Sequence, residues 1–282
     1  QVWTGPVEPQ PVLRATYPPY DWQTENRIKN YWDMYTLNDN VTGYVADTLI
    51  TASRAYDDPR FVKALKDLGE FLILAQMPLP QPGWAQQYDY AMRPIWARKF
   101  EPPAVSGDET QEVIETLIKI ASETGDPRYL EPIPKAIEWL ERSRLPDGQL
   151  ARYYELKTNR PLYMTRSGDQ YSLTYDDSRL PSHYGWKTSS RLDSLAQRYS
   201  ECRRSIATPD TSSRAESPSA DRDRIRQIIQ SLDEQGRWIS TYEGTPRIGQ
   251  LKLPIGTKYL ASEVFSDNLQ QLSRYIKESN GS

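Results

Sequence analysis

The sequence is poor in cysteine and histidine, with one of each among its 282 residues. A single cysteine, Cys202, excludes an internal disulfide and a cluster of thiolate metal ligands. A single histidine, His183, excludes a multi-histidine metal site, and no nucleophile motif accompanies it elsewhere. We therefore predict a packing or hydrogen-bonding role for His183, and we expect any chemistry to depend on carboxylates, arginine, lysine or a hard cation.

The sequence also lacks a strong charge of one sign and a long apolar run. Its net charge is -3, so it has no basic field of the kind that nucleic-acid-binding proteins show. No apolar run approaches the roughly 20 residues that span a bilayer. The chain opens Gln-Val-Trp-Thr-Gly-Pro, which has neither a basic start nor an apolar signal core, so we expect either a cytoplasmic protein or one whose leader has been removed.

What the chain does contain is a repeated helical pattern. A helix is predicted over residues 41–55, and Asp58 and the following Pro59 are typical of the start of a second helix, to about residue 76. The same junction returns at Asp126, 68 residues after Asp58, and a looser third copy covers residues 225–232. The pattern predicts an all-α fold, an α/α toroid (an incomplete α/α barrel) of helical hairpins whose long irregular loops form a cleft at one end.

The chain is long enough for one large domain or two small ones, and we predict one domain over residues 1–282. Within it, the proline-rich residues 1–22 are predicted to form an extended arm. Residues 203–223 lack apolar periodicity and are predicted to form a surface loop. We expect the protein to be a monomer.

Aromatic and charged side chains are concentrated in residues 83–107, where prolines and glycines prevent a long helix. Such a mixture is typical of a cleft in which rings stack on a ligand and ions orient it, but also of a structural loop with buried rings. Three acids lie in loop-like sequence, Asp39, Asp89 and Glu101. Two carboxylates could serve as the acid and base of a glycoside hydrolase, or they could hold Ca²⁺. For calcium, Asn38 and Asn40 could add amide oxygens, but a helix cap explains residues 38–40 equally well.

Six basic residues lie in the loops that follow the repeated helices: Arg93, Arg98, Lys99, Arg152, Lys157 and Arg160. Arginine pairs with carboxylates through two parallel hydrogen bonds, so an anionic sugar such as a uronate is a more natural ligand than a neutral one. The alternative is that several of these residues pair with Glu101, Glu155 and their neighbours.

Four motifs, in order over roughly residues 30–165, resemble the pectate lyases of polysaccharide lyase family 10. They are Leu37-Asn-Asp-Asn, Trp84-Ala-Gln-Gln-Tyr-Asp, Trp96-Ala-Arg-Lys-Phe-Glu-Pro-Pro-Ala-Val-Ser-Gly-Asp-Glu and Ala151-Arg-Tyr-Tyr-Glu-Leu-Lys-Thr-Asn-Arg-Pro. The resemblance implies a helical toroid and calcium-assisted β-elimination on polygalacturonate, which gives 4,5-unsaturated oligogalacturonides. It also implies a secreted or periplasmic enzyme.

The resemblance further implies roles for individual residues. Arg98 would be the Brønsted base, and Asp39 and Asp89 would hold Ca²⁺ together with a substrate carboxylate. The remaining site residues would bind substrate, with two rings stacking on sugar: Asn38, Trp84, Tyr88, Arg152, Lys157 and Arg160. Two alternatives stay open, a glycoside hydrolase on a similar toroid with Asp89 and Glu101 as acid and base, and a non-catalytic binder of acidic polysaccharide.

Overall fold

The structure is a computed structural model that describes residues 13–24, 30–56, 58–208, 222–244 and 253–280. The chain divides into two compact units, Gln1–Pro209 and Asp210–Ser282, and each is described by itself. The prediction of one domain over the whole chain stays a prediction. None of the described helices is long and apolar enough to cross a membrane.

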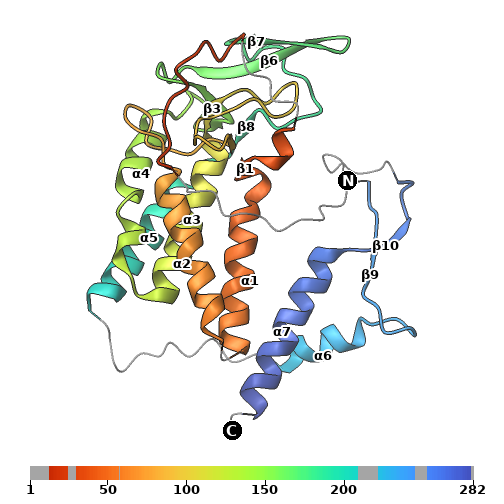
Figure 1. Ribbon diagram of the computed structural model, residues 1–282. Coiled ribbons are helices and arrows are strands. Elements are labelled where there is room, and N and C mark those ends of the chain that lie inside the picture. Colours follow the sequence, from red (N-terminus) through yellow and green to blue (C-terminus); the bar gives the residue numbers. More distant parts are fainter. Residues whose placement is uncertain (1–12, 25–29, 57, 209–221, 245–252, 281–282) are drawn as a thin grey trace. The chain divides into compact units, whose positions relative to one another are not determined.

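Five α-helices build the first unit, and α3 packs against the other four. They are α1 (Val41–Ala55), α2 (Pro59–Leu74), α3 (Gly107–Thr124), α4 (Ile133–Arg142) and α5 (Leu192–Ala207), accompanied by the short 3-10 helices η1 (Tyr31–Asp33), η2 (Asn38–Asn40) and η3 (Pro127–Leu130). The predicted helix over residues 41–55 is confirmed by α1, and the predicted second helix by α2 (Figure 1).

The repeated junction is a helix cap at both of its first two copies. The Asp58 carboxylate accepts the backbone N–H of Arg60 at 2.9 Å, and the Asp126 carboxylate accepts that of Arg128 at 3.0 Å. Each bond satisfies one of the free N–H groups at a helix start. The first cap begins the long helix α2, whereas the second begins only η3, which precedes α4.

The prediction of an all-α fold is wrong, because antiparallel sheets are part of the first unit. A four-stranded sheet has the order β3-β5-β6-β7, formed by β3 (Ala104–Ser106), β5 (Tyr153–Glu155), β6 (Pro161–Ser167) and β7 (Gln170–Thr174). Two smaller sheets pair β1 (Tyr35–Thr36) with β2 (Gln87–Tyr88) and β4 (Leu150–Ala151) with β8 (Lys187–Thr188). The fold is therefore a helical layer with strands, not a toroid of helical hairpins alone.

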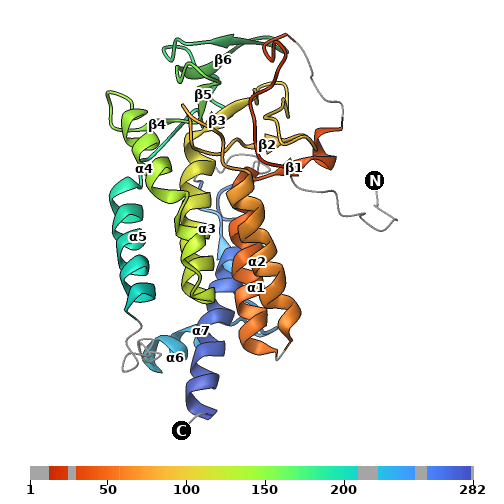
Figure 2. The same cartoon turned by 60° about the vertical axis from the view of Figure 1, so that its left-hand side comes forward.

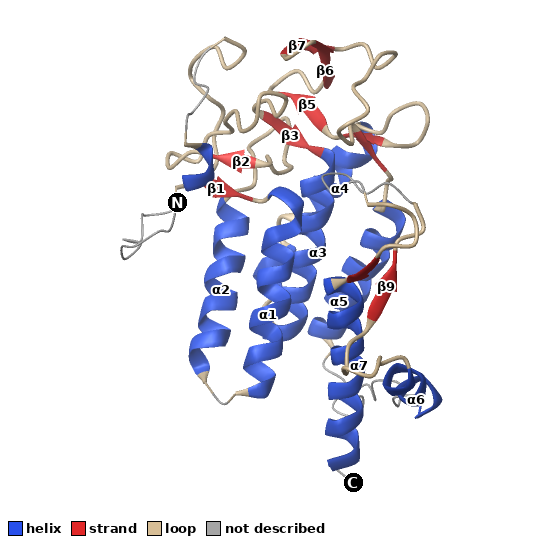
Figure 3. Ribbon diagram, turned by 90° about the vertical axis from the view of Figure 1, so that its right-hand side faces the viewer, coloured by secondary structure: helices blue, strands red, loops and turns tan. Residues whose placement is uncertain are grey.

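The strands and the irregular segments lie together at one end of the helices, as Figures 1, 2 and 3 show from three sides. The segment rich in rings and charges belongs to this end, where a bridge joins Trp84 to Ser106 and another joins Tyr88 to Pro94. Beneath it the core is aromatic, and its largest fully buried side chains include Trp84, Trp96, Trp139, Tyr153 and Tyr154. A rigid scaffold of this kind can hold irregular loops in fixed positions.

The second unit contains α6 (Arg222–Gln230), β9 (Ile239–Thr241), β10 (Lys258–Leu260) and α7 (Ser262–Asn280), with β9 antiparallel to β10. The predicted third helix is confirmed by α6. The prediction of a surface loop over residues 203–223 is wrong at both ends of the segment, because α5 continues to Ala207 and α6 begins at Arg222. Residues 209–221 of that loop and residues 1–12 of the predicted arm lie outside the described residues.

Candidate functional site

The pair of Arg98 and Glu101 lies at the strand end of the first unit, in a tight turn of the loop before β3. The Glu101 carboxylate accepts the backbone N–H and the Nε–H of Arg98 at 2.9 and 2.8 Å on Oε2, and the guanidinium Nη2 at 2.5 Å on Oε1. The Glu101 side chain is 3% exposed, while that of Arg98 is 45% exposed. The cation therefore reaches solvent from a buried anionic anchor.

This pairing fixes the charge of both groups. The hydrogen bond that Arg98 donates to Glu101 raises the pKa of Arg98 above its usual range, against the opposing effect of burial. Burial raises the pKa of Glu101, but the hydrogen bonds and charge of Arg98 outweigh it, and the net shift is downward. Glu101 is thus held ionised, so of the two roles that the glycoside hydrolase alternative gives to Asp89 and Glu101 it does not suit that of the general acid.

Aromatic rings surround the Arg98 guanidinium. Its central carbon lies 5.0 Å from the ring centroid of Phe100 and 5.6 Å from that of Tyr184, distances at which a cation is attracted to a ring. The Tyr184 hydroxyl donates to Glu101 at 3.0 Å and lies 2.7 Å from the hydroxyl of Tyr153. Sequence reasoning missed Tyr184, although it belongs to the aromatic run around the single histidine.

Arg152, predicted to bind substrate, is largely buried and already paired. Its side chain is 13% exposed, and its guanidinium lies 3.3 Å from Asp108 and 3.0 Å from Glu109, both at the start of α3. It also lies 3.5 Å from the amide oxygen of Asn38, the long end of hydrogen-bond range. Burial lowers the pKa of Arg152, but Glu109 and the other groups around it outweigh this and raise it. These contacts assign Arg152 to the support of the site.

Arg160 and Lys157 lie in the turn between β5 and β6 and stay available. The Arg160 guanidinium lies 3.5 Å from the centroid of the Tyr175 ring, and the Lys157 ammonium lies 5.9 Å from that of Tyr17. Over the part of the chain that the structure describes, neither cation forms an ion pair with a carboxylate within 4.0 Å. Both side chains could therefore receive an anionic group.

The two predicted calcium ligands lie at opposite ends of one strand pair. In the β1–β2 register, Tyr35 faces Tyr88, and the Leu37 N–H donates to the carbonyl of Gln86 at 2.9 Å. Because the pair is antiparallel, the chain leaves it toward Asp39 at one end and toward residue 89 at the other. No group of three or more His, Cys, Asp or Glu side chains within the described ranges is placed to hold a metal ion.

Asp89 is also occupied by its own turn. Its carboxylate accepts the backbone N–H groups of Ala91 and Arg93 at 3.0 and 2.9 Å, and it forms an ion pair of 2.7 Å with the Arg93 guanidinium. Asp39 instead is exposed, forms no ion pair with the described residues, and accepts only from the amide of Asn38, at 2.7 Å. Of the predicted pair, only Asp39 therefore has a carboxylate without an ion-pair partner in the described chain, whereas Asp89 is held by its own turn.

Trp84 and Tyr88, predicted to stack on sugar, are core residues instead. Both side chains are 0% exposed. The Trp84 indole donates to the carbonyl of Leu72 at 2.8 Å, and the Tyr88 hydroxyl donates to that of Ala75 at 2.7 Å, so both tie the loop to the end of α2. Their polar groups are satisfied, as buried Trp and Tyr require, and no ring face is left for a ligand.

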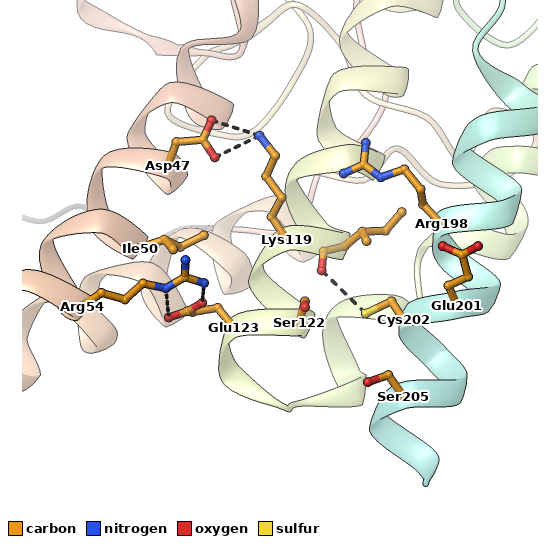
Figure 4. A pocket seen from close by; sticks show the side chains of 11 residues that line it. Asp47, Ile50, Arg54, Lys119, Ser122, Glu123, Arg198, Glu201, Cys202 and Ser205 are labelled. Carbon is orange, nitrogen blue, oxygen red and sulfur yellow. Dashed lines mark hydrogen bonds and ion pairs between the residues drawn. The ribbon is translucent and has the colours of Figure 1, made fainter. Parts of the chain in front are cut away.

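A cavity of about 520 Å³ lies away from this end, between α1, α3 and α5 (Figure 4). Its charged groups pair with one another across the helices: Lys119 with Asp47 at 2.9 Å, and Arg54 with Glu123. The thiol of Cys202 points to the carbonyl of Ile118 at 3.7 Å. These pairs join α1 to α3, and Arg198 of α5 pairs with Glu115 of α3 at 2.8 Å, which leaves little charge for a ligand.

No family model matches the sequence, and no curated protein matches it. Among solved structures, the chain is similar to the family 10 polysaccharide lyase from Cellvibrio cellulosa, with 20% identity and a TM-score of 0.50 over 60% of this chain and 62% of that chain. A mutant of the lyase from the same organism, in complex with trigalacturonic acid, is similar with 19% identity and a TM-score of 0.49 over 64% and 65%.

The chain thus spans less than two thirds of the length of either lyase structure. At 20% identity, the similarity to the first shows a shared fold over that part of the chain.

Proposed function

We propose that the chain is a polysaccharide lyase that binds polygalacturonate, or a related uronate polysaccharide, at the strand end of its helices. The carrying observation is Arg98, a half-exposed guanidinium anchored on buried Glu101 and flanked by Phe100 and Tyr184. An anchored arginine suits a carboxylate, and the flanking rings suit a sugar face. The shared fold with a family 10 polysaccharide lyase supports the same class.

The reaction proposed is β-elimination. A base removes the C5 proton, its electron pair forms the C4–C5 double bond, and the C4–O bond breaks with the leaving oxygen taking up a proton. Arginine paired with the C6 carboxylate makes the C5 proton more acidic and stabilises the charge that develops on the carboxylate. Arg160 and Lys157, which have no carboxylate partner in the described parts of the chain, are the proposed carboxylate-binding residues.

Arg98 is the proposed base, and Glu101 opposes that role in the free protein. A base must be neutral, and the Glu101 hydrogen bond raises the pKa of Arg98. Turnover therefore requires a substrate that takes Arg98 away from Glu101, and an alkaline pH. The same observation favours a second candidate, a non-catalytic binder in which Arg98 stays cationic and only pairs with uronate.

The proposed lyase would depend on calcium, with Asp39 as its one proposed calcium ligand. A calcium ion shared between this exposed carboxylate and a substrate carboxylate would withdraw further charge from the C6 group. The chain's own part is to present Asp39, next to Asn38, on the short helix that precedes α1.

The test is the ultraviolet absorbance of the conjugated 4,5-unsaturated uronide during incubation with polygalacturonate at alkaline pH, with calcium and then with a chelator. We expect a calcium-dependent rise that Arg98→Ala reduces by ~10²-fold or more. Product without the double bond would indicate hydrolysis. Binding without product would indicate the non-catalytic binder, and neither binding nor product would contradict both proposals.

A further inference from the structure

A second cavity, of about 340 Å³, lies at the strand end of the first unit, and its lining includes basic residues. One wall is the turn of the β6–β7 hairpin, with Arg166 and Gly168, and the other is the segment 179–183, with Arg179 and His183. None of the residues that line it is acidic. Two guanidinium groups around one hollow attract an anion.

Neither arginine is neutralised by a buried acid. The Arg166 Nε–H donates to the carbonyl of Gly168 at 2.7 Å, and its guanidinium reaches only Asp169, at 3.5 Å, whose side chain is 91% exposed. An ion pair so exposed is worth little and is easily exchanged for another anion. Arg179 is exposed and forms no ion pair with any residue that the structure describes.

The cavity is connected to the Arg98 site by aromatic rings in edge-to-face and tilted contact. The ring centroids of His183 and Phe100 lie 5.1 Å apart. The central carbon of the Arg98 guanidinium lies 5.0 Å from the same Phe100 centroid. The Tyr171 hydroxyl lies 3.0 Å from Nε2 of His183, and the Arg166 guanidinium lies 5.6 Å from the Tyr171 ring. Phe100 and His183 therefore lie between the Arg98 guanidinium and this cavity.

We propose that this cavity is a second carboxylate-binding subsite for the same uronate chain, in which Arg166 and Arg179 pair with a carboxylate one or more sugars away from Arg98. The inference rests on the proposed function, since a neutral polysaccharide would not use it. It also gives His183 a place in the wall of the site, beyond the packing role that the sequence predicts.

His183 reports on occupation of the cavity. Burial, followed by the charges of Arg166 and Arg98, lowers its pKa. The other titratable groups near it are Tyr171, which shares its hydrogen bond, Tyr184, which packs beside it, and Arg179, on the same wall of the cavity. A bound carboxylate offsets the arginine charges and so raises the pKa of His183.

The experiment is proton NMR of the full chain, in which one imidazole gives the only histidine signals. We expect trigalacturonate to move this signal and to raise its apparent pKa by roughly half a unit or more, while a neutral trisaccharide does neither. Arg179→Gln should weaken trigalacturonate binding by ~3- to 10-fold in calorimetry and reduce the shift. Arg204→Gln, on the exposed side of α5, is the matched control and should change neither.

The outcomes separate this inference from the proposed function. Tight trigalacturonate binding with an unmoved imidazole signal, and equal affinity of the wild-type and Arg179→Gln proteins, would overturn the second subsite and leave the proposed function standing. No binding of trigalacturonate would overturn both.

Discussion

The bond between Arg98 and Glu101 sets the protonation of the proposed base. The Glu101 hydrogen bond raises the pKa of Arg98, so removing the negative charge lowers it. In Glu101→Gln the amide oxygen can still accept from the Arg98 backbone, which preserves the turn. We expect the rising limb of the pH–rate profile, which follows deprotonation of the base, to move to lower pH by about one unit or more.

The measurement for Glu101→Gln is the initial rate of absorbance increase over a pH series. Asp58→Asn, which changes a similar arginine pair at the start of α2, is its control and should leave the profile unchanged. A profile that does not move in Glu101→Gln would contradict Arg98 as the base.

Glu112 in α3 makes the stability depend on pH. Burial, and then the charges of Glu109 and Asp108, raise its pKa to about 8. Within the described chain, its Oε2 is buried without a hydrogen-bond partner. Between its unfolded pKa and about 8, the folded state binds more protons than the unfolded state, so the free energy of unfolding falls as pH rises through this range.

Glu112→Gln removes this titration. We expect it to raise the free energy of unfolding by ~1–2 kcal/mol at pH 8 and to change it little at pH 4. The value at pH 8 is smaller than the full pKa shift implies, because solvent screens this partly exposed group. Denaturant unfolding at the two pH values measures the difference. An equal effect at both would show that charge at Glu112 is not the cause.

At the level of single residues, the sequence predicted local contacts better than distant ones. Arg98 and Glu101 are only three positions apart, and such pairing is the alternative to substrate binding that the sequence leaves open for the basic residues. The joint calcium site of Asp39 and Asp89 could not be judged from the sequence, because the distance between them depends on the register of β1 and β2. Tyr184 reaches the site from 83 residues beyond Glu101, which spacing alone cannot show.

Among the elements, α2 depends on a close approach to η3. A Cβ at Gly69 would lie 2.4 Å from Cε1 of the fully buried Tyr129 ring. Alanine gains ~1 kcal/mol of helix propensity over glycine, but forcing a buried ring aside costs about 1–3 kcal/mol. The clash wins, because the ring cannot move into solvent.

We therefore expect Gly69→Ala to lower the free energy of unfolding by ~1 kcal/mol, the middle of the difference between the two terms, which thermal or denaturant unfolding would measure. Gly185→Ala is the control, since no atom lies within 4 Å of its added Cβ and its backbone is not left-handed. A Gly69→Ala protein as stable as the wild type would show that the contact between α2 and η3 is loose.

The sequence predicted the long helices but not the strands, for a physical reason. Helices α1 and α2 show apolar periodicity over four turns, and α2 also begins with the Asp58 cap. Strands of two or three residues have no measurable period, and β3 and β5 are buried on both faces, so they do not alternate. Only the β6–β7 hairpin has a recognisable sequence feature, the glycine of its turn, Gly168, which adopts φ 58°. The all-α prediction did not use this feature.

For the whole molecule, net charge and local charge act in opposite directions on a polyanion. The chain carries a net charge of -3, so at long range it repels polygalacturonate weakly. Binding must come from exposed cations at the strand end, among them Arg98, Lys157, Arg160, Arg166 and Arg179. These cations act over less than a Debye length and are open to screening.

The affinity for trigalacturonate should therefore fall with salt, by ~3- to 10-fold between 50 and 300 mM sodium chloride, because ion pairs at exposed sites are screened. Calorimetry over a salt series measures this, with the fully methyl-esterified trisaccharide as the ligand that has no charge to screen. Arg160→Gln should reduce both the affinity at low salt and its dependence on salt, since it removes one exposed partner of a carboxylate. An affinity independent of salt would mean that sugar stacking, not the cations, holds the ligand, and the assignment of the substrate as a uronate would fail with it.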